Sequence, residues 1–158
     1  MQTKFSSRTP WREKLQRVQQ RKVVDIPPGM QRRFGSGTML IPKPLDVDAL
    51  IRRIPKGRLV TQSEIRRVLA EQANADVACP ITTGIFVRIA AEAANEAAVA
   101  GGKRITPFWR VIRDDGSLNP KLPGGIEGQM ERLEAEGHRF TAEKTPKIEN
   151  FERALLRF

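Results

Sequence analysis

The chain contains few side chains that could perform covalent or metal chemistry. Its only cysteine, Cys79, comes just before Pro80 at the predicted start of a helix, and its only histidine is His138. One cysteine cannot close an intramolecular disulfide, and the two residues together are too few for a Cys/His zinc site. A single histidine also argues against a serine–histidine–carboxylate relay. Cys79 is the one possible thiol nucleophile, and a capping or packing role is the alternative.

Two aromatic residues, Phe108 and Trp109, stand between Pro107 and Arg110 in the segment ITPFWRVIRDDG. Adjacent rings can form a stacking surface for a nucleic-acid base, worth about 1–3 kcal/mol per base. The alternative is that they fill the protein core. Glu136 could serve as a general base, although the sequence supplies no evident partner for it.

The balance of charge is the strongest global feature of the sequence. Among its 158 residues, 28 Lys and Arg outnumber 18 Asp and Glu, which gives a net charge of +10 and a pI near 10.6. A basic excess of this size favours polyanionic partners, and nucleic acid first among them. A basic protein without such a partner is the alternative.

Residues 1–44 are predicted to form an irregular, Pro- and Gly-rich N-terminal arm. They hold ten basic and two acidic residues, so +8 of the total +10 lies in this segment. A short helix within 11–22 is compatible with the spacing of its apolar residues. We expect the arm to order on a partner or to wrap the domain, with a solvated tail as the alternative.

Beyond the arm, the spacing of apolar residues predicts a helical domain over 45–140 and a tail over 141–158. Asp46 is the expected cap of its first helix. Thr61 and Glu64 form a T-x-x-E capping box. Further helices are predicted over 62–73, 80–100, 124–136 and 148–158, and a short strand over 103–112. The first two of these helices could form a helix-turn-helix, although their connection exceeds the usual three or four residues.

Two segments carry a specific resemblance: IPKGRLVTQSEI (54–65) and TPFWRVIRDDGSLNPKLPGGIEGQMERLEAEGHR (106–139). They resemble the DNA-binding domain of the alkylguanine-DNA alkyltransferases and their alkyltransferase-like relatives, over about 60% of the chain. The resemblance implies a mainly α fold, a winged helix-turn-helix with a small amount of strand. Family members bind the minor groove, swing a damaged base out of the duplex, and transfer its alkyl group to a cysteine.

The family's Pro-Cys-His-Arg-Val motif corresponds to Pro107–Val111 in this chain. Phe108 takes the place of the acceptor cysteine and Trp109 that of the activating histidine. Glu136 matches the family glutamate, whereas Gln62 and Ile81 replace the family's tyrosine and arginine finger. The resemblance therefore implies an alkyltransferase-like protein for DNA repair that has no catalytic residues and accepts no alkyl group.

The predicted DNA contacts combine the starts of two helices with nearby cations. They are Gln62, Ser63, Ile81, Thr82, Thr83, Arg58, Lys103, Arg104, Arg110 and Arg113. The predicted pocket consists of Phe108, Trp109, Gly124, Gly125 and Glu136. Double-stranded DNA is the expected partner, and we expect no cofactor and no metal.

We further expect a cytoplasmic protein, because the sequence shows neither a secretory signal nor about 18 consecutive apolar residues. We also expect a monomer. Two other functions stay open. One is an enzyme of altered chemistry that acts on a base or small molecule in the Phe108/Trp109 pocket through Glu136 or Cys79. The other is a protein-interaction module whose arm docks an acidic partner.

Overall fold

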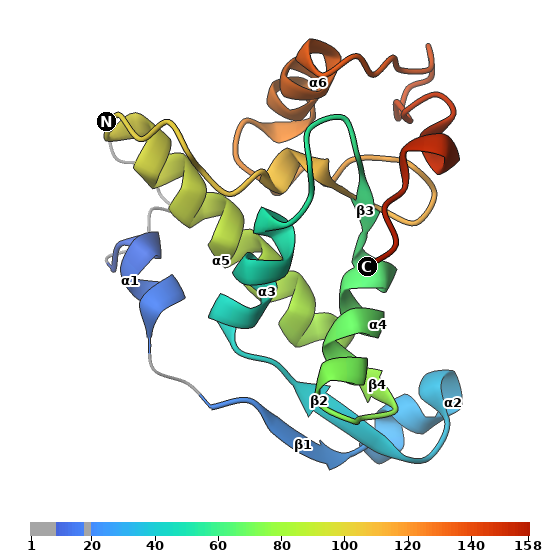
Figure 1. Ribbon diagram of the computed structural model, residues 1–158. Coiled ribbons are helices and arrows are strands. Elements are labelled where there is room, and N and C mark those ends of the chain that lie inside the picture. Colours follow the sequence, from blue (N-terminus) through green and yellow to red (C-terminus); the bar gives the residue numbers. More distant parts are fainter. Residues whose placement is uncertain (1–8, 18–19) are drawn as a thin grey trace.

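One long helix, α5 (Pro80–Val99), crosses the computed structural model, which describes residues 9–17 and 20–158 (Figure 1). The other elements surround it. The remaining α-helices are α1 (Trp11–Gln16), α2 (Gln31–Phe34), α3 (Pro44–Arg52), α4 (Gln62–Gln72) and α6 (Gly125–Ala135). Single 3₁₀ turns are η1 (Pro28–Met30), η2 (Phe108–Arg110) and η3 (Phe151–Ala154). The fold is helical with small sheets, as the sequence predicts.

The helices α4 and α5 begin where the sequence predicts them. The Thr61 hydroxyl caps α4 by accepting the Glu64 amide at 3.2 Å, but the Glu64 carboxylate does not return the bond. It accepts instead from Arg67 and from the Phe158 amide, so it anchors the C-terminus on α4. α5 begins with Pro80 at its first position, where the missing amide hydrogen costs nothing.

α3 differs from the prediction at its cap. Lys43 occupies the N-cap position without a side-chain hydrogen bond, and Asp46 lies inside the first turn. Pro44 opens the helix, because its fixed φ suits the first helical position. Asp46 therefore contributes its charge near the positive end of the helix instead of capping it.

The N-terminal arm is more regular than expected. β1 (Lys22–Asp25) and β2 (Thr38–Ile41) form an antiparallel pair, and β2 pairs in parallel with β4 (Val77–Ala78). Thr38 and Asp76 strengthen this junction, since the Thr38 amide donates to the Asp76 carboxylate at 2.8 Å. Residues 22–41 of the arm thus add two strands to β4, the strand that precedes α5, as Figure 1 shows. The expectation of an irregular segment is wrong for residues 22–41.

The start of the arm also packs on the domain. The Glu96 carboxylate of α5 accepts the backbone amides of Trp11 and Arg12 at 3.0 and 2.8 Å, so a side chain of α5 caps α1. Leu15 and Leu40 belong to the same buried cluster as the centre of α5. The described residues of the arm therefore contribute to the core of the fold.

The C-terminal segment returns to the middle of the chain. Leu59 forms a β-bridge with Leu155, next to the parallel pair β3 (Val60–Thr61) and β5 (Val111–Ile112). The predicted helix over 148–158 is only the single turn η3, and the predicted strand over 103–112 contains η2 and the two residues of β5. A wing is an antiparallel hairpin, so the parallel β3–β5 pair does not confirm a winged helix.

The core lies where α5 meets α3, α4 and η2. Val87, Ala90 and Ala91 are fully buried on α5, and small side chains let neighbouring elements approach closely. None of the helices in the described part of the chain combines the length and apolar character needed to span a membrane.

Candidate nucleic-acid interface and basic cavity

Phe108 and Trp109 lie in the single turn η2, between α5 and α6. Both are buried, with exposed fractions of 2% and 8%. Their rings meet edge to face, with centroids 5.3 Å apart and an angle of 81° between their planes. This is a favoured geometry for aromatic pairs in a core. Neither ring presents an open face on which a base could stack, so the burial fits the core-packing alternative.

Glu136 ties this turn to two other parts of the fold. Its carboxylate accepts the Trp109 indole N–H at 2.7 Å, the Arg110 guanidinium at 2.9 Å and the Gly57 amide at 2.9 Å. Arg110 also donates to the Ile54 carbonyl at 2.7 Å. The side chains of Arg110 and Glu136 are only 14% and 7% exposed, so they form a largely buried ion pair.

The surroundings keep Glu136 ionised. Burial raises the pKa of its carboxyl, but the hydrogen bonds from Arg110, Gly57 and Trp109 outweigh burial and hold the pKa below its usual value. A carboxylate that already accepts these bonds is a weak proton acceptor. Glu136 is therefore suited to positioning Trp109 and Arg110 and is poorly suited to general-base chemistry.

A cavity of about 550 Å³ lies beside Trp109, between the end of α5 and α6. Among the residues that the structure describes, its lining contains no Asp or Glu and five cationic side chains, which are Arg52, Lys103, Arg104, Arg110 and Arg132. The Arg132 guanidinium lies 4.4 Å from the centre of the Trp109 ring. We call this hollow the basic cavity. It contains three of the predicted DNA contacts, which are Lys103, Arg104 and Arg110.

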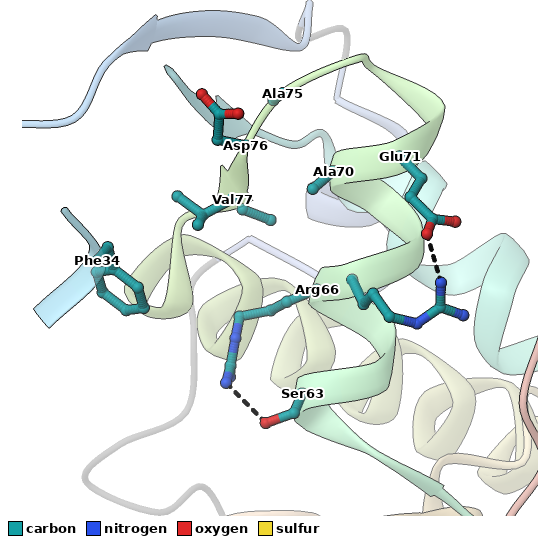
Figure 2. A pocket seen from close by; sticks show the side chains of 10 residues that line it. Phe34, Ser63, Arg66, Ala70, Glu71, Ala75, Asp76 and Val77 are labelled. Atoms are coloured by element: carbon teal, nitrogen blue, oxygen red, sulfur yellow. Dashed lines mark hydrogen bonds and ion pairs between the residues drawn. The ribbon is translucent and has the colours of Figure 1, made fainter. Parts of the chain in front are cut away.

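A different cavity joins the arm to α4. Figure 2 shows Phe34 of α2 facing Arg66 and Ser63 of α4. The space that these residues line has a volume of about 340 Å³. Arg66 donates to the Ser63 hydroxyl at 2.9 Å, and Ser63 in turn donates to the Asp114 carboxylate. Burial lowers the pKa of the Arg66 guanidinium, Asp114 opposes this effect, and the neighbouring Arg33 adds to it. Ser63 is thus engaged within the protein.

Arg66 also borders a neighbouring space of about 360 Å³. Its lining brings Gln62 and Arg113, two predicted DNA contacts, together with Arg33 of the arm and the carboxylates of Asp114 and Asp115. The sequence placed Arg33 in the arm without assigning it to any site. The pairing of β2 with β4 is what carries α2 to the start of α4.

The first turns of α5 divide into an inward and an outward face. Ile81 and Ile85 are 63% and 53% exposed, which is unusual for isoleucine. Thr83 is 1% exposed, and its hydroxyl has no hydrogen-bond partner among the described residues. Thr83 therefore cannot reach a ligand in a groove, and this prediction is corrected. Arg88, one turn beyond Ile85, has a 46% exposed side chain that lies 3.9 Å from Glu92.

Cys79 is the N-cap residue of α5 and is 6% exposed. Its sulfur accepts from the Thr82 amide at 3.5 Å and from the Thr82 hydroxyl at 3.3 Å. Thr82 is therefore also engaged locally. The position agrees with the capping and packing alternative for this thiol.

Other predicted residues have different neighbours from those expected. Arg58 donates to the carbonyls of Ala154 and Leu155, so it fastens the C-terminal segment to β3. Arg110 is held by Glu136 in a largely buried ion pair, so it does not fit its predicted role as a DNA contact, whereas Arg58 is exposed and stays a predicted contact. Gly124 and Gly125 start α6 with positive φ values of 81° and 63°, and they do not line the basic cavity.

The described residues contain no group of three or more His, Cys, Asp or Glu side chains that could hold a metal ion. Sequence reasoning missed Arg52, Arg132, Ile85 and Arg88. The helical spacing of Ile81, Ile85 and Arg88 was the available signal for the exposed face of α5. Arg52 and Arg132 gave no such signal, since only the tertiary fold brings α3 and α6 to one cavity.

The fold is similar to that of an alkyltransferase-like protein of known structure. Two crystal structures of the S. pombe protein Atl1 have a similar fold, one in complex with damaged DNA containing O6-carboxymethylguanine and one in complex with DNA. Each is 20% identical to this chain and covers 73% of it and 94% of its own length, with TM-scores of 0.53 and 0.54. No protein-family model and no curated protein matches the chain. At this identity the similarity shows a common fold.

Proposed function

We propose that this chain is a non-enzymatic protein that binds duplex DNA through a helix-turn-helix formed by α4 and α5. The observation that carries the proposal is the exposed face of α5. Ile81 and Ile85 are open to solvent, Arg88 follows on the next turn, and the first turn has no acidic residue. An exposed apolar pair beside a cation can contact the sugars and phosphates of a groove.

The fold comparison supports the same partner. The two Atl1 structures of this fold were both determined in complex with DNA, one of them damaged. The net charge of +10 adds long-range attraction to a polyanion, and the positive end of α5 favours phosphate. We infer binding to double-stranded DNA by a monomer, and a cytoplasmic location remains a proposal from sequence.

Absence of alkyl transfer is part of the proposal. By the sequence resemblance, Phe108 takes the position of the family's acceptor cysteine, and an aromatic ring carbon cannot act as the nucleophile that accepts an alkyl group. The remaining thiol, Cys79, is buried at the N-cap of α5. Glu136, the one residue of the family's transfer chemistry that the resemblance retains, already accepts hydrogen bonds from Trp109, Arg110 and Gly57. These features do not favour the alternative of an enzyme with altered chemistry.

Binding is tested by fluorescence anisotropy with a labelled duplex over a series of salt concentrations. Affinity should fall by about tenfold or more between about 50 and 200 mM salt, because phosphate contacts release counterions. A duplex with O6-methylguanine is then incubated with the protein, and the intact mass of the protein is measured. We expect no added methyl group, in the wild type or in Cys79→Ser. Salt-independent binding, or stoichiometric methylation, would reject the proposal.

A further inference from the structure

We propose that the basic cavity is a second binding site, separate from the α5 face, for a ligand that carries phosphate. The ligand is a nucleotide, either free or as one unit of a nucleic-acid strand. The proposal does not depend on duplex binding by α4 and α5. It rests on the charges that line the cavity, on the apolar surface beneath them, and on the position of the cavity in the fold.

The charges are only partly neutralised by the protein. Arg110 pairs with Glu136, and Arg52 pairs with Asp48 at 2.7 Å. The other three cations of the cavity have no carboxylate within ion-pair distance in the described part of the chain: Lys103, Arg104 and Arg132. Like charges that converge on one hollow repel each other, and a bound phosphate removes this repulsion. Arginine also matches phosphate geometry with two parallel hydrogen bonds.

The inner surface of the cavity suits the apolar part of a nucleotide. Ile105, Pro107 and Trp109 line it, and Arg132 lies over the indole ring. A guanidinium positioned over an aromatic ring can itself provide a surface on which a base stacks. The volume of about 550 Å³ falls within the usual range for small-ligand sites.

The end of α5 does not oppose an anion as strongly as a bare helix end would. Carbonyl groups at a helix C-terminus carry partial negative charge. Here the Gly101 and Gly102 amides donate to the carbonyls of Ala98 and Ala97 at 3.0 and 2.8 Å. Gly102 is needed for this approach, because a Cβ there would lie 2.8 Å from the Ala97 oxygen.

The position of the cavity makes it a separate site. α5 has 20 residues and is therefore about 30 Å long, with Ile81 near its first residue and the cavity at its last turn, where Ala98 lines it. Figure 1 shows α5 running from beside α4 and β4 to the upper left edge of the molecule. A smaller hollow that also borders Arg52, Arg104 and Ile105 adds Arg12 of α1. This continuation gives a strand a path beyond the first nucleotide.

The test uses the fluorescence of Trp109 as the local probe. The chain has two tryptophans, so Trp11→Phe leaves Trp109 as the only indole, and the backbone bond of residue 11 to Glu96 is retained. This full-length protein is titrated separately with AMP and with a five-nucleotide deoxythymidine strand. We expect saturable quenching. Quenching by AMP but not by the strand would identify a free nucleotide as the ligand. Quenching by the strand but not by AMP would identify nucleic acid, and either result supports the site.

Matched variants assign the signal to the cavity. Lys103→Gln/Arg104→Gln should weaken binding about tenfold or more, because two charged contacts to phosphate are lost. Arg139→Gln/Lys144→Gln removes the same two charge types from exposed positions that do not line the cavity, and it should change affinity less than twofold. Ile85→Glu should leave AMP affinity unchanged, because Ile85 does not line the cavity. The cavity proposal and the proposal of duplex binding by α5 can therefore fail independently. No saturable quenching by either ligand, or equal affinity in the first variant, would overturn the inference.

Discussion

The indole N–H of Trp109 donates a 2.7 Å hydrogen bond to the carboxylate of Glu136. The two residues belong to η2 and to the end of α6, 27 positions apart in the sequence. In the family that the sequence resembles, these positions correspond to the histidine and glutamate that activate a thiol. Here the same connection joins a buried aromatic ring to a buried ion pair, so its consequence is mechanical: it holds η2 against α6.

Trp109→Phe tests the mechanical role of this bond. The variant loses the N–H donor and part of the ring volume, while Glu136 keeps Arg110 and Gly57 as donors. We expect the free energy of unfolding to fall by about 2 kcal/mol. Trp11→Phe is the control, because its indole is only partly buried, and it should cost about 1 kcal/mol or less. Equal losses in urea unfolding would contradict the assignment.

Glu136→Gln tests the ion pair directly. The neutral amide would leave the largely buried Arg110 guanidinium without its counter-charge. Removing one partner of a buried pair is strongly destabilising, and we expect a loss of about 3 kcal/mol. Glu134→Gln changes an exposed neighbour on the same helix and should alter stability by about 0.5 kcal/mol or less. A similar loss in both variants would show that Glu136 has no special structural role.

Stability should decline in acid. Burial raises the folded-state pKa of Glu136, but the hydrogen bonds from Arg110, Gly57 and Trp109 have the larger combined effect and lower this pKa below its usual 4.5. A group with a lowered folded pKa stabilises the fold above its unfolded pKa, and the contribution disappears as pH falls through the folded pKa. Glu64 adds to this trend, since the hydrogen bond from Arg67 lowers its pKa too.

Thermal melts between about pH 7 and pH 3 measure this dependence. The wild type should be nearly constant above about pH 5 and lose stability below it. Glu136→Gln should show a shallower decline, because one of the titrating carboxyl groups is absent. Parallel curves for the two proteins would exclude Glu136 as a source of acid sensitivity.

Gly116 is required for close packing of the C-terminal segment. Its φ is +87°, and an added Cβ would lie 2.5 Å from the Phe151 ring. Gly116→Ala should cost about 1–2 kcal/mol for the left-handed backbone and about 1–3 kcal/mol more for the clash. Gly137→Ala has a similar φ of +97° but open space, so it should incur only the backbone cost. Denaturant unfolding of both variants checks the difference.

Local signals explain which elements could be predicted. Thr61 caps α4, Pro80 opens α5, and Gly137 follows α6 with a positive φ. Each depends on residues within one turn of a helix, so the sequence contains the information. β1 and β2 carry no comparable signal, because strands of four residues become stable only by pairing.

The site was less predictable because its partners are distant in sequence. The sequence indicates no partner for Arg110 or Arg58. In the structure Arg110 is held by Glu136, 26 residues away, and Arg58 donates to the carbonyl of Ala154, 96 residues away. The inward position of Thr83 depends on how α5 is rotated in the core, which composition does not fix. The sequence alone allows Phe108 and Trp109 to form either a stacking surface or part of the core, and their burial favours the core.

Duplex binding as proposed depends most on the exposed first turns of α5. Ile85→Glu places a negative charge on this face, and Val99→Glu makes the same change at an exposed position, 82% open, near the other end of the same helix. Anisotropy titrations of a labelled duplex with both variants at one salt concentration give the most direct comparison. We expect Ile85→Glu to weaken binding about tenfold or more, since repulsion from phosphate is added at the contact, and Val99→Glu to change it less than threefold. Equal affinities for the two variants would contradict DNA binding by this face of α5.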